Sequence, residues 1–290
     1  MSESQMSLKE FSLNNGQKIA SLGFGTWELD TEAVCVPAVT QALETGYRVI
    51  DTAARYMNEQ FVGKALAESG MKRDEYHVTT KVWVTDFGYE QTLRAFDKSL
   101  KKLNLDYVDL YLLHWPVEGF TDSWKALEKL QEEGLTKAIG VCNFEIDHLQ
   151  TLAAGANIKP VLNQVETHPL FQQRDLRDYL QEQDILLEAW SPLGRGDANL
   201  LTNPALKKIA DEHNKDVGQV ILRWHLQRGT LAIPRSSKPT RVASNFQIFD
   251  FVLNDDQMAT INALDTNKRS AGDPKDPEWI AKLMSMPIPD

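Results

Sequence analysis

Eight short apolar segments, each typical of a buried β-strand, recur along this chain of 290 residues, and amphipathic stretches separate them. In the stretch 89–103, for example, Leu93, Phe96 and Leu100 recur at helical spacing. Strands that alternate with helices predict βαβ units and a parallel sheet. Eight such units without a linker predict an α/β fold, a closed (β/α)8 TIM barrel, rather than an open sheet. Strands are expected at 21–25, 48–52, 77–81, 107–114, 137–141, 161–165, 185–190 and 230–234.

Two additions are expected to flank the barrel. Residues 7–20 alternate apolar and polar side chains around Asn14-Asn15-Gly16, which is the pattern of an N-terminal β-hairpin. An extra C-terminal helix is expected at about 255–264, and the proline-containing tail 265–290 is expected to be an irregular extension. Because no change of composition divides the chain, residues 1–290 are predicted to form a single domain.

The composition narrows the class of protein. The net charge of −10 argues against general binding to nucleic acid or anionic membranes, which requires a basic surface. The two cysteines, Cys35 and Cys142, and the histidines lack metal-ligand spacing, so neither a disulfide framework nor a metal is expected. The N-terminus lacks a basic-then-apolar leader, and no apolar stretch approaches membrane-spanning length. A cytoplasmic protein is expected.

Three successive predicted strands end on titratable residues, namely Asp51, Lys81 and His114, and Tyr56 follows Asp51 by five residues. In a (β/α)8 barrel the C-terminal strand ends share the face that carries active sites. Burying charge is unfavourable unless the charge is paired. Buried charges are nevertheless useful in catalysis, because charges beside a tyrosine shift its pKa and so tune it as a proton donor. Later strand ends are expected to add Asn143, Gln164, Ser191 and Arg235 to this face.

Five segments carry a family resemblance: Gly23-Phe24-Gly25-Thr26-Trp27, residues 46–56, Leu113-His114-Trp115-Pro116, Gly140-Val141-Cys142-Asn143-Phe144 and Ile233-Pro234-Arg235-Ser236-Ser237. Over nearly its whole length the chain resembles the aldo-keto reductases. It is most similar to bacterial 2,5-diketo-D-gluconate reductase-like members, with short substrate loops. The resemblance implies NADPH-dependent reduction of aldehydes and ketones by hydride transfer.

The resemblance further implies that Tyr56 is the general acid that protonates the carbonyl oxygen. A free tyrosine has a pKa of about 10 and is a poor donor at neutral pH. Lys81 beside it is expected to lower that pKa, and Asp51 to keep Lys81 charged. His114 is expected to orient the carbonyl oxygen by a hydrogen bond, or to share the proton transfer. The plainer alternatives are that Asp51 and Lys81 form a structural ion pair, that Tyr56 is an aromatic residue at the pocket rim and that His114 is a hydrogen-bonded core histidine.

No GxGxxG lies between a predicted strand and helix, so a Rossmann site is not indicated. The resemblance instead implies that the barrel face binds NADPH or NADP+, with Asn143 and Gln164 at the carboxamide and Trp190 stacked on the nicotinamide. Cys142, also a candidate cofactor contact, stands where the family usually has serine. The alternative for Trp190 is that it only packs against the barrel. The alternative for Cys142 is that it is simply a small buried residue. Further implied contacts are Gly25, Thr26, Ser191 and Leu193.

The loop 191–197 resembles the one that covers the pyrophosphate in the family. Its glycines allow backbone amides to approach a phosphate, and Arg195 could pair with it, although a plain turn would also use glycines. A guanidinium fork and a hydroxyl suit the 2′-phosphate of NADP(H), so NADP(H) is expected to be preferred over NAD(H). The alternative to a phosphate site is that these basic residues form the solvent-exposed start of a helix. The implied contacts with the 2′-phosphate and adenine are Arg235, Ser236, Arg241 and Asn245, next to Ser244, which replaces a frequent glutamate.

Three tryptophans follow different strand ends: Trp27, Trp83 and Trp115. With His114 they are expected to form the substrate site, as an apolar wall over the carbonyl carbon, and rim packing is the alternative. Met57 stands where the family often has glycine, and its bulk is expected to narrow the pocket or shift the loop 56–60. Small aldehydes, α-diketones, methylglyoxal and keto-sugar acids all fit as substrates.

Two other functions are compatible with such a barrel. An NADPH-binding sensor or auxiliary subunit would keep the cofactor site but show little turnover, and the complete set of Asp51, Tyr56, Lys81 and His114 favours the enzyme. A sugar-phosphate isomerase or lyase is disfavoured by the same set and by the Arg235 segment. The family resemblance and the lack of a heptad or apolar stripe favour a monomer, and a small carbonyl compound is expected as its partner.

Overall fold

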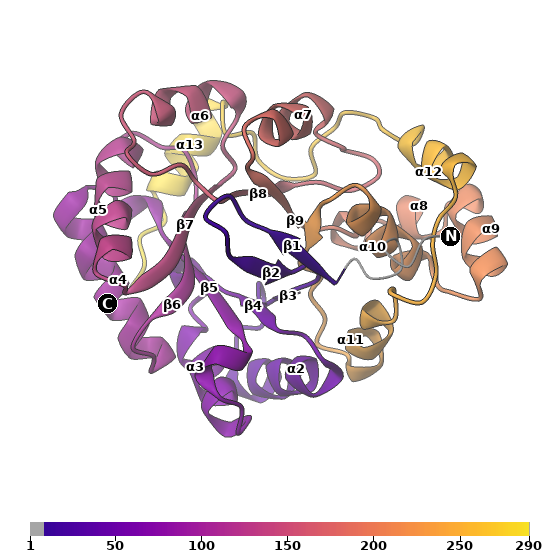
Figure 1. Ribbon diagram of the computed structural model, residues 1–290, viewed down its shortest axis with the longest axis horizontal. Coiled ribbons are helices and arrows are strands. Elements are labelled where there is room, and N and C mark those ends of the chain that lie inside the picture. The colour runs from indigo at the N-terminus through magenta and orange to yellow at the C-terminus, as the bar shows by residue number, and fades with distance from the viewer. Residues whose placement is uncertain (1–8, 290) are drawn as a thin grey trace.

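The computed structural model describes residues 9–289, and at its centre eight parallel strands curl into a barrel inside a ring of helices (Figure 1). Each strand pairs with the next one along the chain, from β3 to β10. The predicted (β/α)8 barrel is confirmed. Its strands are β3 (Phe24–Gly25), β4 (Val49–Asp51), β5 (His77–Val82), β6 (Val108–Leu113), β7 (Thr136–Cys142), β8 (Leu162–Glu166), β9 (Leu186–Trp190) and β10 (Leu231–Ala232).

The barrel closes where its last strand meets its first. Leu22 forms a parallel bridge with Ala232, and the Gly23 amide donates to the Ala232 carbonyl oxygen at 2.9 Å. A Cβ at Gly23 would lie 2.9 Å from the side chain of Ile233 and 3.0 Å from that of Val49. A side chain at position 23 would therefore crowd Ile233 and Val49 at this seam, and glycine avoids this.

A hairpin covers the end of the barrel where the strands begin (Figure 1). Its strands β1 (Glu10–Ser12) and β2 (Lys18–Ala20) pair antiparallel, as predicted, while residues 7 and 8 of the predicted hairpin lie outside the described residues. Leu13 packs against the apolar side chains inside the barrel. The amide of Asn14 donates to two backbone carbonyls that precede β8 and β9, at 2.9 and 3.0 Å. Ligands must therefore enter at the opposite end.

Amphipathic helices cover the outside of the sheet, and the largest apolar cluster lies between the two layers. The predicted helix 89–103 is confirmed as α4. Within residues 9–289 no helix is long and apolar enough to cross a membrane. The helices around the barrel are α2 (Glu32–Thr45), α3 (Glu59–Glu68), α4 (Tyr89–Leu103), α5 (Phe120–Glu132), α6 (Ile146–Ala153), α7 (Arg174–Glu182), α9 (Pro204–His213), α10 (Val217–Gln227) and α11 (Pro239–Phe246), joined by the short α8 (Ala198–Leu201) and by α12 (Asp255–Asn262), the predicted extra helix.

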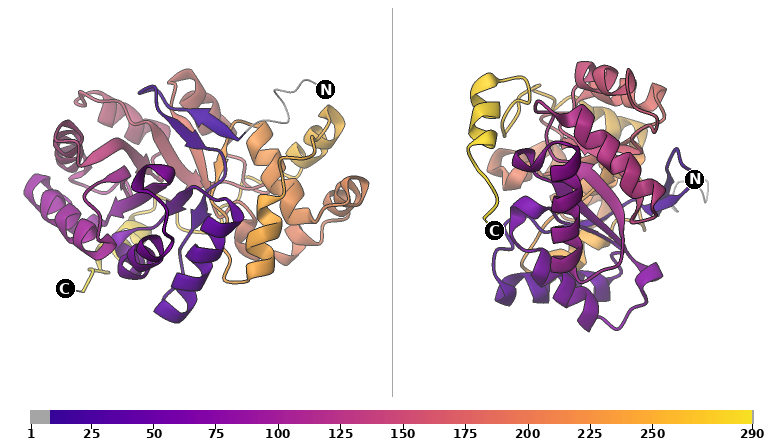
Figure 2. Two further views of the ribbon diagram at one scale, coloured as in Figure 1. Left: turned by 60° about the horizontal axis from the view of Figure 1, so that its bottom comes forward. Right: turned by 90° about the vertical axis from the view of Figure 1, so that its left-hand side faces the viewer.

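The prediction of a wholly irregular tail is wrong, because the tail contains helix α13 (Pro277–Met284). Asp276 caps this helix by accepting from the Glu278 amide at 2.9 Å, and Pro277 fits the first turn, where no amide donor is needed. Leu283 packs with Trp83 and neighbouring apolar side chains. The yellow helix lies on the side of the molecule opposite to the hairpin (Figure 2). A proline after a capping residue here begins a helix.

The contact between α3 and α4 yields a stability prediction. A Cβ at Gly63 in α3 would lie 2.3 Å from the Leu103 carbonyl oxygen, at the end of α4. Because backbone cannot give way as a flexible side chain can, Gly63→Ala is expected to lower the free energy of unfolding by about 1–3 kcal/mol. Urea denaturation measures it.

Gly155→Ala is the matched control, since a Cβ there meets no atom within 4 Å. It is expected to change the free energy of unfolding by less than about 1 kcal/mol. Equal stability of the two variants would contradict this account of the helix contact.

Candidate active site

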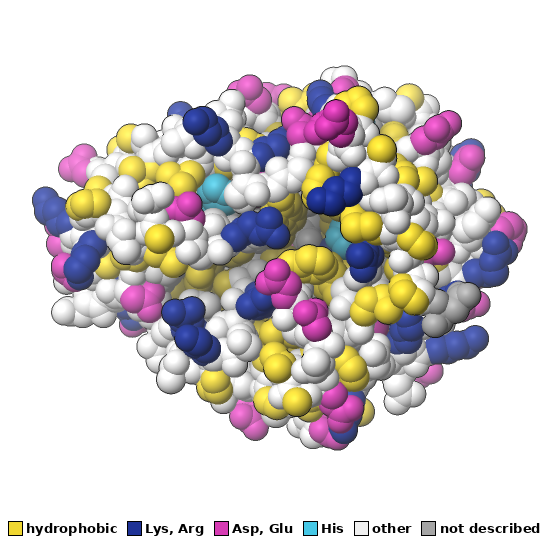
Figure 3. All heavy atoms as spheres, turned by 180° about the vertical axis from the view of Figure 1, so that it is seen from behind, with side chains coloured by type: hydrophobic (Ala, Val, Ile, Leu, Met, Phe, Trp, Pro, Cys, Tyr) yellow, Lys and Arg dark blue, Asp and Glu magenta, His cyan; other side chains and the backbone are white. Residues whose placement is uncertain are grey.

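A cavity of about 1400 Å³ opens at the barrel end where the strands finish. Figure 3 shows this face, hollowed at its centre. Small-ligand pockets usually hold roughly 300–1,000 Å³, so this one has room for a large ligand together with a small one. The predicted strand-end residues that line the cavity are Asp51, His114, Asn143, Gln164, Ser191 and Arg235, and Lys81 contacts Tyr56 from beneath.

The predicted catalytic residues meet at a buried ion pair. Lys81 Nζ, from β5, lies 2.6 Å from Asp51 Oδ1, from β4, and the two side chains are 0% and 2% exposed. The ammonium also donates to the Thr52 carbonyl oxygen at 2.9 Å and to the Tyr56 hydroxyl at 3.2 Å. Gln164 Nε2 donates to the second oxygen of Asp51 at 2.8 Å. Every proton of the buried ammonium thus has an acceptor, which burial of a charge requires.

Burial decides how Tyr56 is protonated. Burial lowers the pKa of Lys81, but Asp51 and Tyr56 reverse this and hold that pKa above its ordinary value, so Lys81 is charged. Burial also raises the pKa of Tyr56, and the charge of Lys81 opposes this without cancelling it. The predicted lowering of the Tyr56 pKa is therefore wrong, although Lys81 acts in the predicted direction. Tyr56 carries its proton at neutral pH, as a proton donor must.

His114 stands beside Tyr56, with the two ring centres 5.7 Å apart. Burial, aided by the charges of Lys81 and Arg55, holds the pKa of His114 well below its usual range. Its Nδ1 is buried without a hydrogen-bond partner among residues 9–289. A neutral imidazole has one N–H to donate, so His114 can offer a carbonyl oxygen a hydrogen bond next to the Tyr56 hydroxyl.

The two side chains predicted to hold a carboxamide lie near the ends of β7 and β8. The Asn143 amide of the main chain donates to the Gln164 carbonyl oxygen at 2.9 Å. In its side chain, Asn143 Nδ2 donates to the His114 carbonyl oxygen at 3.0 Å, and Oδ1 accepts from Trp190 Nε1 at 2.9 Å. Since an amide group has two donor protons and two acceptor lone pairs, both side chains keep capacity for a ligand. The same bonds fix Trp190 at the cavity wall.

Four non-glycine residues that line the cavity have a left-handed backbone: Glu28, Asn143, Ser191 and Arg195, with φ of 60°, 62°, 49° and 55°. Such conformations are uncommon outside glycine and cost of order 1–3 kcal/mol in unfavourable cases. They cluster at ligand sites, where the surrounding structure holds them. Two of the four lie in the loop 191–197, which was predicted to cover a pyrophosphate.

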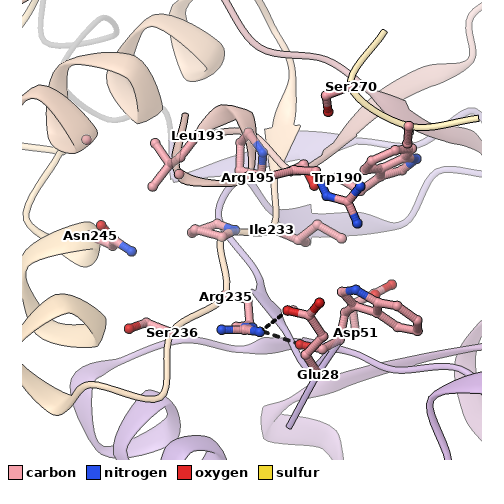
Figure 4. Close-up of a pocket in the computed structure, with 18 of the residues that line it drawn as sticks. Glu28, Asp51, Trp190, Leu193, Arg195, Ile233, Arg235, Ser236, Asn245 and Ser270 are labelled. Atoms are coloured by element: carbon pink, nitrogen blue, oxygen red, sulfur yellow. Dashed lines mark hydrogen bonds and ion pairs between the residues drawn. The ribbon is translucent and has the colours of Figure 1, made fainter. Parts of the chain in front are cut away.

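Basic and polar groups gather at the other end of the cavity, around the N-terminus of α11. A guanidinium, a hydroxyl and a helix N-terminus together suit a phosphate. Leu193 and Arg195 lie across the cavity from this group (Figure 4). The residues predicted for the 2′-phosphate and adenine all line this end, namely Arg235, Ser236, Arg241 and Asn245, together with Ser244 and Gly25.

Aromatic rings form the wall above Tyr56 and His114. Trp27 packs edge-on against Tyr56 with ring centres 4.9 Å apart, and the predicted Trp83 and Trp115 line the cavity beside it. Trp279 of α13 adds a fourth ring, 5.7 Å from Trp115. Sequence reasoning missed Trp279 because the tail was expected to be irregular.

Residues 21–266 match the Aldo/keto reductase family, a stretch that contains all eight barrel strands and most of the cavity wall. The chain belongs to this family. It is 49% identical to the 9,11-endoperoxide prostaglandin H2 reductase of Trypanosoma cruzi, over 90% of this chain and 93% of the relative. It is also 49% identical to the glyoxal reductase of Bacillus subtilis, over 90% and 95%. A Bombyx mori aldo-keto reductase solved in complex with NADP superposes with a TM-score of 0.86 at 35% identity, covering 91% of this chain and 94% of that one.

Two predicted cofactor contacts of this aldo/keto reductase lie behind the cavity wall. Thr26 is fully buried, and its hydroxyl donates to the Asp51 carbonyl oxygen at 2.9 Å. Cys142 packs among apolar side chains inside the barrel, where burial raises the pKa of its thiol well above its usual range. Side chains alternate along a strand, so Cys142 points inward while Asn143 reaches the cavity. Both residues support the site from behind, and direct contact with a ligand is not supported.

Met57 does not narrow the pocket as predicted. Its side chain is 37% exposed, and it is not among the described residues that line the cavity. Its backbone is left-handed, with φ of 57°, directly after the short helix η1 (Ala54–Tyr56) that carries the catalytic candidate. Glycine adopts this conformation freely, so the backbone at Met57 is one that a glycine would also suit.

Two buried polar residues near the site were not predicted. Asn58 accepts from the Thr52 hydroxyl and donates to the Thr26 carbonyl oxygen, both at 2.8 Å, and so ties the loop that carries Tyr56 to the start of the barrel. Glu188 of β9 is fully buried, and burial together with the charge of Asp51 raises its pKa to about 8. A charged residue within the apolar run 185–190 was the available signal for Glu188.

Glu166 fastens the tail over the cavity. Its carboxylate accepts from the amide and hydroxyl of Ser270 at 2.7 and 2.5 Å, from the Ala271 amide at 3.2 Å and from His168 at 3.0 Å. Burial raises the pKa of Glu166, but the hydrogen bonds from His168 and Ser270 outweigh this and hold it below its usual value. Ser270 and Ala271 line the cavity, so the roof depends on this carboxylate.

Glu166→Gln should loosen the tail. The amide group would oppose N–H donors with its own protons, which is expected to cost about 1–3 kcal/mol and to speed tryptic cleavage at Lys268 and Arg269. In the wild type, the tail is expected to be protected from trypsin at pH values above the usual carboxyl pKa. This protection is expected to be lost as the pH falls through the lowered pKa of Glu166. Glu182→Gln, at an exposed position of α7, is the control. Equal cleavage rates in both variants would contradict the role of Glu166.

Proposed function

We propose that this aldo/keto reductase reduces small carbonyl compounds with NADPH, and that Tyr56 is the general acid. The observation that carries the proposal is the Tyr56 hydroxyl at the cavity floor, 3.2 Å from the buried ammonium of Lys81 and beside His114. A monomer, one domain over residues 1–290 and a cytoplasmic location remain predictions.

The donor set of the cavity suits NADP(H). Its amide groups match a carboxamide, the glycine-containing loop 191–197 matches a pyrophosphate, and Arg235 with Arg241 and Ser236 matches a 2′-phosphate. The volume of about 1400 Å³ leaves room for a small substrate as well. Bound NADP in the Bombyx mori relative supports the same cofactor here.

The chain's own residues then handle the carbonyl oxygen. NADPH, when bound, supplies the hydride that reaches the carbonyl carbon. His114 donates its N–H to the oxygen and holds it near Tyr56. Negative charge develops on that oxygen, and the Tyr56 hydroxyl transfers its proton to it. Lys81 stabilises the resulting phenolate, since a cation at 3.2 Å favours the charged form. Asp51 keeps Lys81 in place through the 2.6 Å ion pair.

Small α-dicarbonyls are the substrate class that fits best. The site above Tyr56 is walled by tryptophan rings and roofed by the tail, so it favours compact, flat substrates. Glyoxal, which names the Bacillus subtilis relative, belongs to this class. Methylglyoxal belongs to it as well, and 2,5-diketo-D-gluconate, a larger keto-sugar acid outside this class, is the further candidate.

Tyr56→Phe tests the general acid. Turnover of methylglyoxal or glyoxal is expected to fall by at least about 10²–10⁴-fold, because the proton donor is lost. NADPH affinity, followed by protein fluorescence, is expected to persist. Tyr89→Phe, at an exposed ring on α4, is the matched control. Turnover of the Tyr56 variant near the wild-type rate would overturn the assignment, and NADPH binding without turnover in the wild type would favour the sensor function.

The 2′-phosphate site predicts cofactor preference. Wild-type kcat/KM is expected to be at least about tenfold higher with NADPH than with NADH, since one charge-assisted phosphate contact contributes on that scale. Arg241→Ala is expected to lower kcat/KM for NADPH and to leave that for NADH unchanged, whereas Arg94→Ala on the exposed face of α4 changes neither. Comparable efficiency with both cofactors in the wild type would contradict the proposal.

A further inference from the structure

Arg235, the cation expected to hold the 2′-phosphate, already has an anionic partner within the chain. Its Nη2 forms an ion pair with the carboxylate of Glu28, and its Nε donates to the Trp27 carbonyl oxygen at 2.8 Å. Figure 4 shows the Glu28 carboxylate reaching from the loop after β3 to the guanidinium. Both side chains line the cavity, so this contact lies where a ligand must bind.

The backbone of Glu28 supports a role at this cavity. Its φ of 60° is left-handed, which glutamate rarely adopts. The Leu29 side chain that follows is fully buried, and the Leu29 amide donates to the Thr26 carbonyl oxygen at 3.1 Å. The turn is therefore fixed on both sides of Glu28, and its carboxylate is held at the cavity.

A phosphate and this carboxylate compete for the same donors. A guanidinium binds a phosphate best with two parallel N–H donors, and Glu28 and Trp27 take one donor group each. A phosphate that reaches Arg235 must displace the carboxylate or bind next to it. In the second case two anions lie a few ångströms apart, which is unfavourable. NADH carries no 2′-phosphate and meets neither cost.

We propose that Glu28 is a specificity-determining residue, an anion within the chain that competes with the 2′-phosphate of NADP(H) for Arg235. Glu28 therefore weakens NADP(H) binding selectively and narrows the preference over NAD(H). The inference rests on the proposed NADP(H) site. The side chains of Glu28 and Arg235 are 56% and 34% exposed, so water and salt moderate the competition.

Glu28→Gln tests the inference, because it removes the charge and keeps the shape. Equilibrium dissociation constants for NADPH, NADP+ and the fragment 2′,5′-ADP, measured by fluorescence or calorimetry, are expected to fall by about fivefold to tenfold, which is the scale of an exposed charge pair together with one like-charge contact. Those for NADH and 5′-ADP, which lack the 2′-phosphate, are expected to change by less than about twofold. The selective gain should diminish at high salt.

Two further variants make the test specific. Glu28→Asn also removes the charge and suits a left-handed backbone, so it covers a loss of folding in the glutamine variant. Asp30→Asn removes an exposed charge two residues away that does not line the cavity, and all its affinities are expected to match the wild type.

The outcomes separate this inference from the proposed function. Equal gains in affinity for 2′,5′-ADP and 5′-ADP, or unchanged affinities in both Glu28 variants, would overturn the proposed competition. Binding of NADPH by the wild type would still support the proposed cofactor site. A wild-type protein that binds neither NADPH nor 2′,5′-ADP would overturn the proposed cofactor site itself.

Discussion

The candidate active site depends on one buried ion pair, between Asp51 and Lys81. Removing two charges from water carries a large desolvation penalty, which is offset only when both are fully hydrogen-bonded. Here β4, β5 and β8 each contribute a partner, because Gln164 reaches across the barrel to Asp51. The Tyr56 hydroxyl is held by this ammonium, and the charge of the ammonium adds to burial in keeping His114 neutral. The barrel must therefore close around the pair before the site exists.

The sequence predicts the barrel well because the barrel is built from repeated strand–helix units. Each apolar run marks a strand, and a polar residue that ends it is expected on the common face, as Asp51 is. The run does not tell which way a side chain points near the strand end. The sequence therefore predicts Thr26 and Cys142 as cavity residues, although both are buried and neither lines the cavity. The predicted lowering of the Tyr56 pKa is wrong because burial, which only the packed structure reveals, exceeds the effect of Lys81.

Contacts between distant segments lay beyond sequence reasoning. Trp279 reaches the cavity only because α13 packs on Trp83 and Trp115, roughly half the chain away. Glu166 ends a strand like its neighbours, yet its carboxylate binds the tail. The ion pair between Glu28 and Arg235 joins the first and last strand ends, which become neighbours only when the barrel closes.

Polar contacts fasten the tail on both sides of α13, and this makes the roof of the pocket an exchangeable part. Glu166 binds its beginning at Ser270, and Trp83 Nε1 donates to the Met286 carbonyl oxygen at 2.7 Å near its end. Between these anchors α13 meets the barrel mainly through apolar packing. Its sequence can change with little effect on the ion pair at the cavity floor. Evolution or design can thus alter which molecules are admitted independently of the chemistry performed on them.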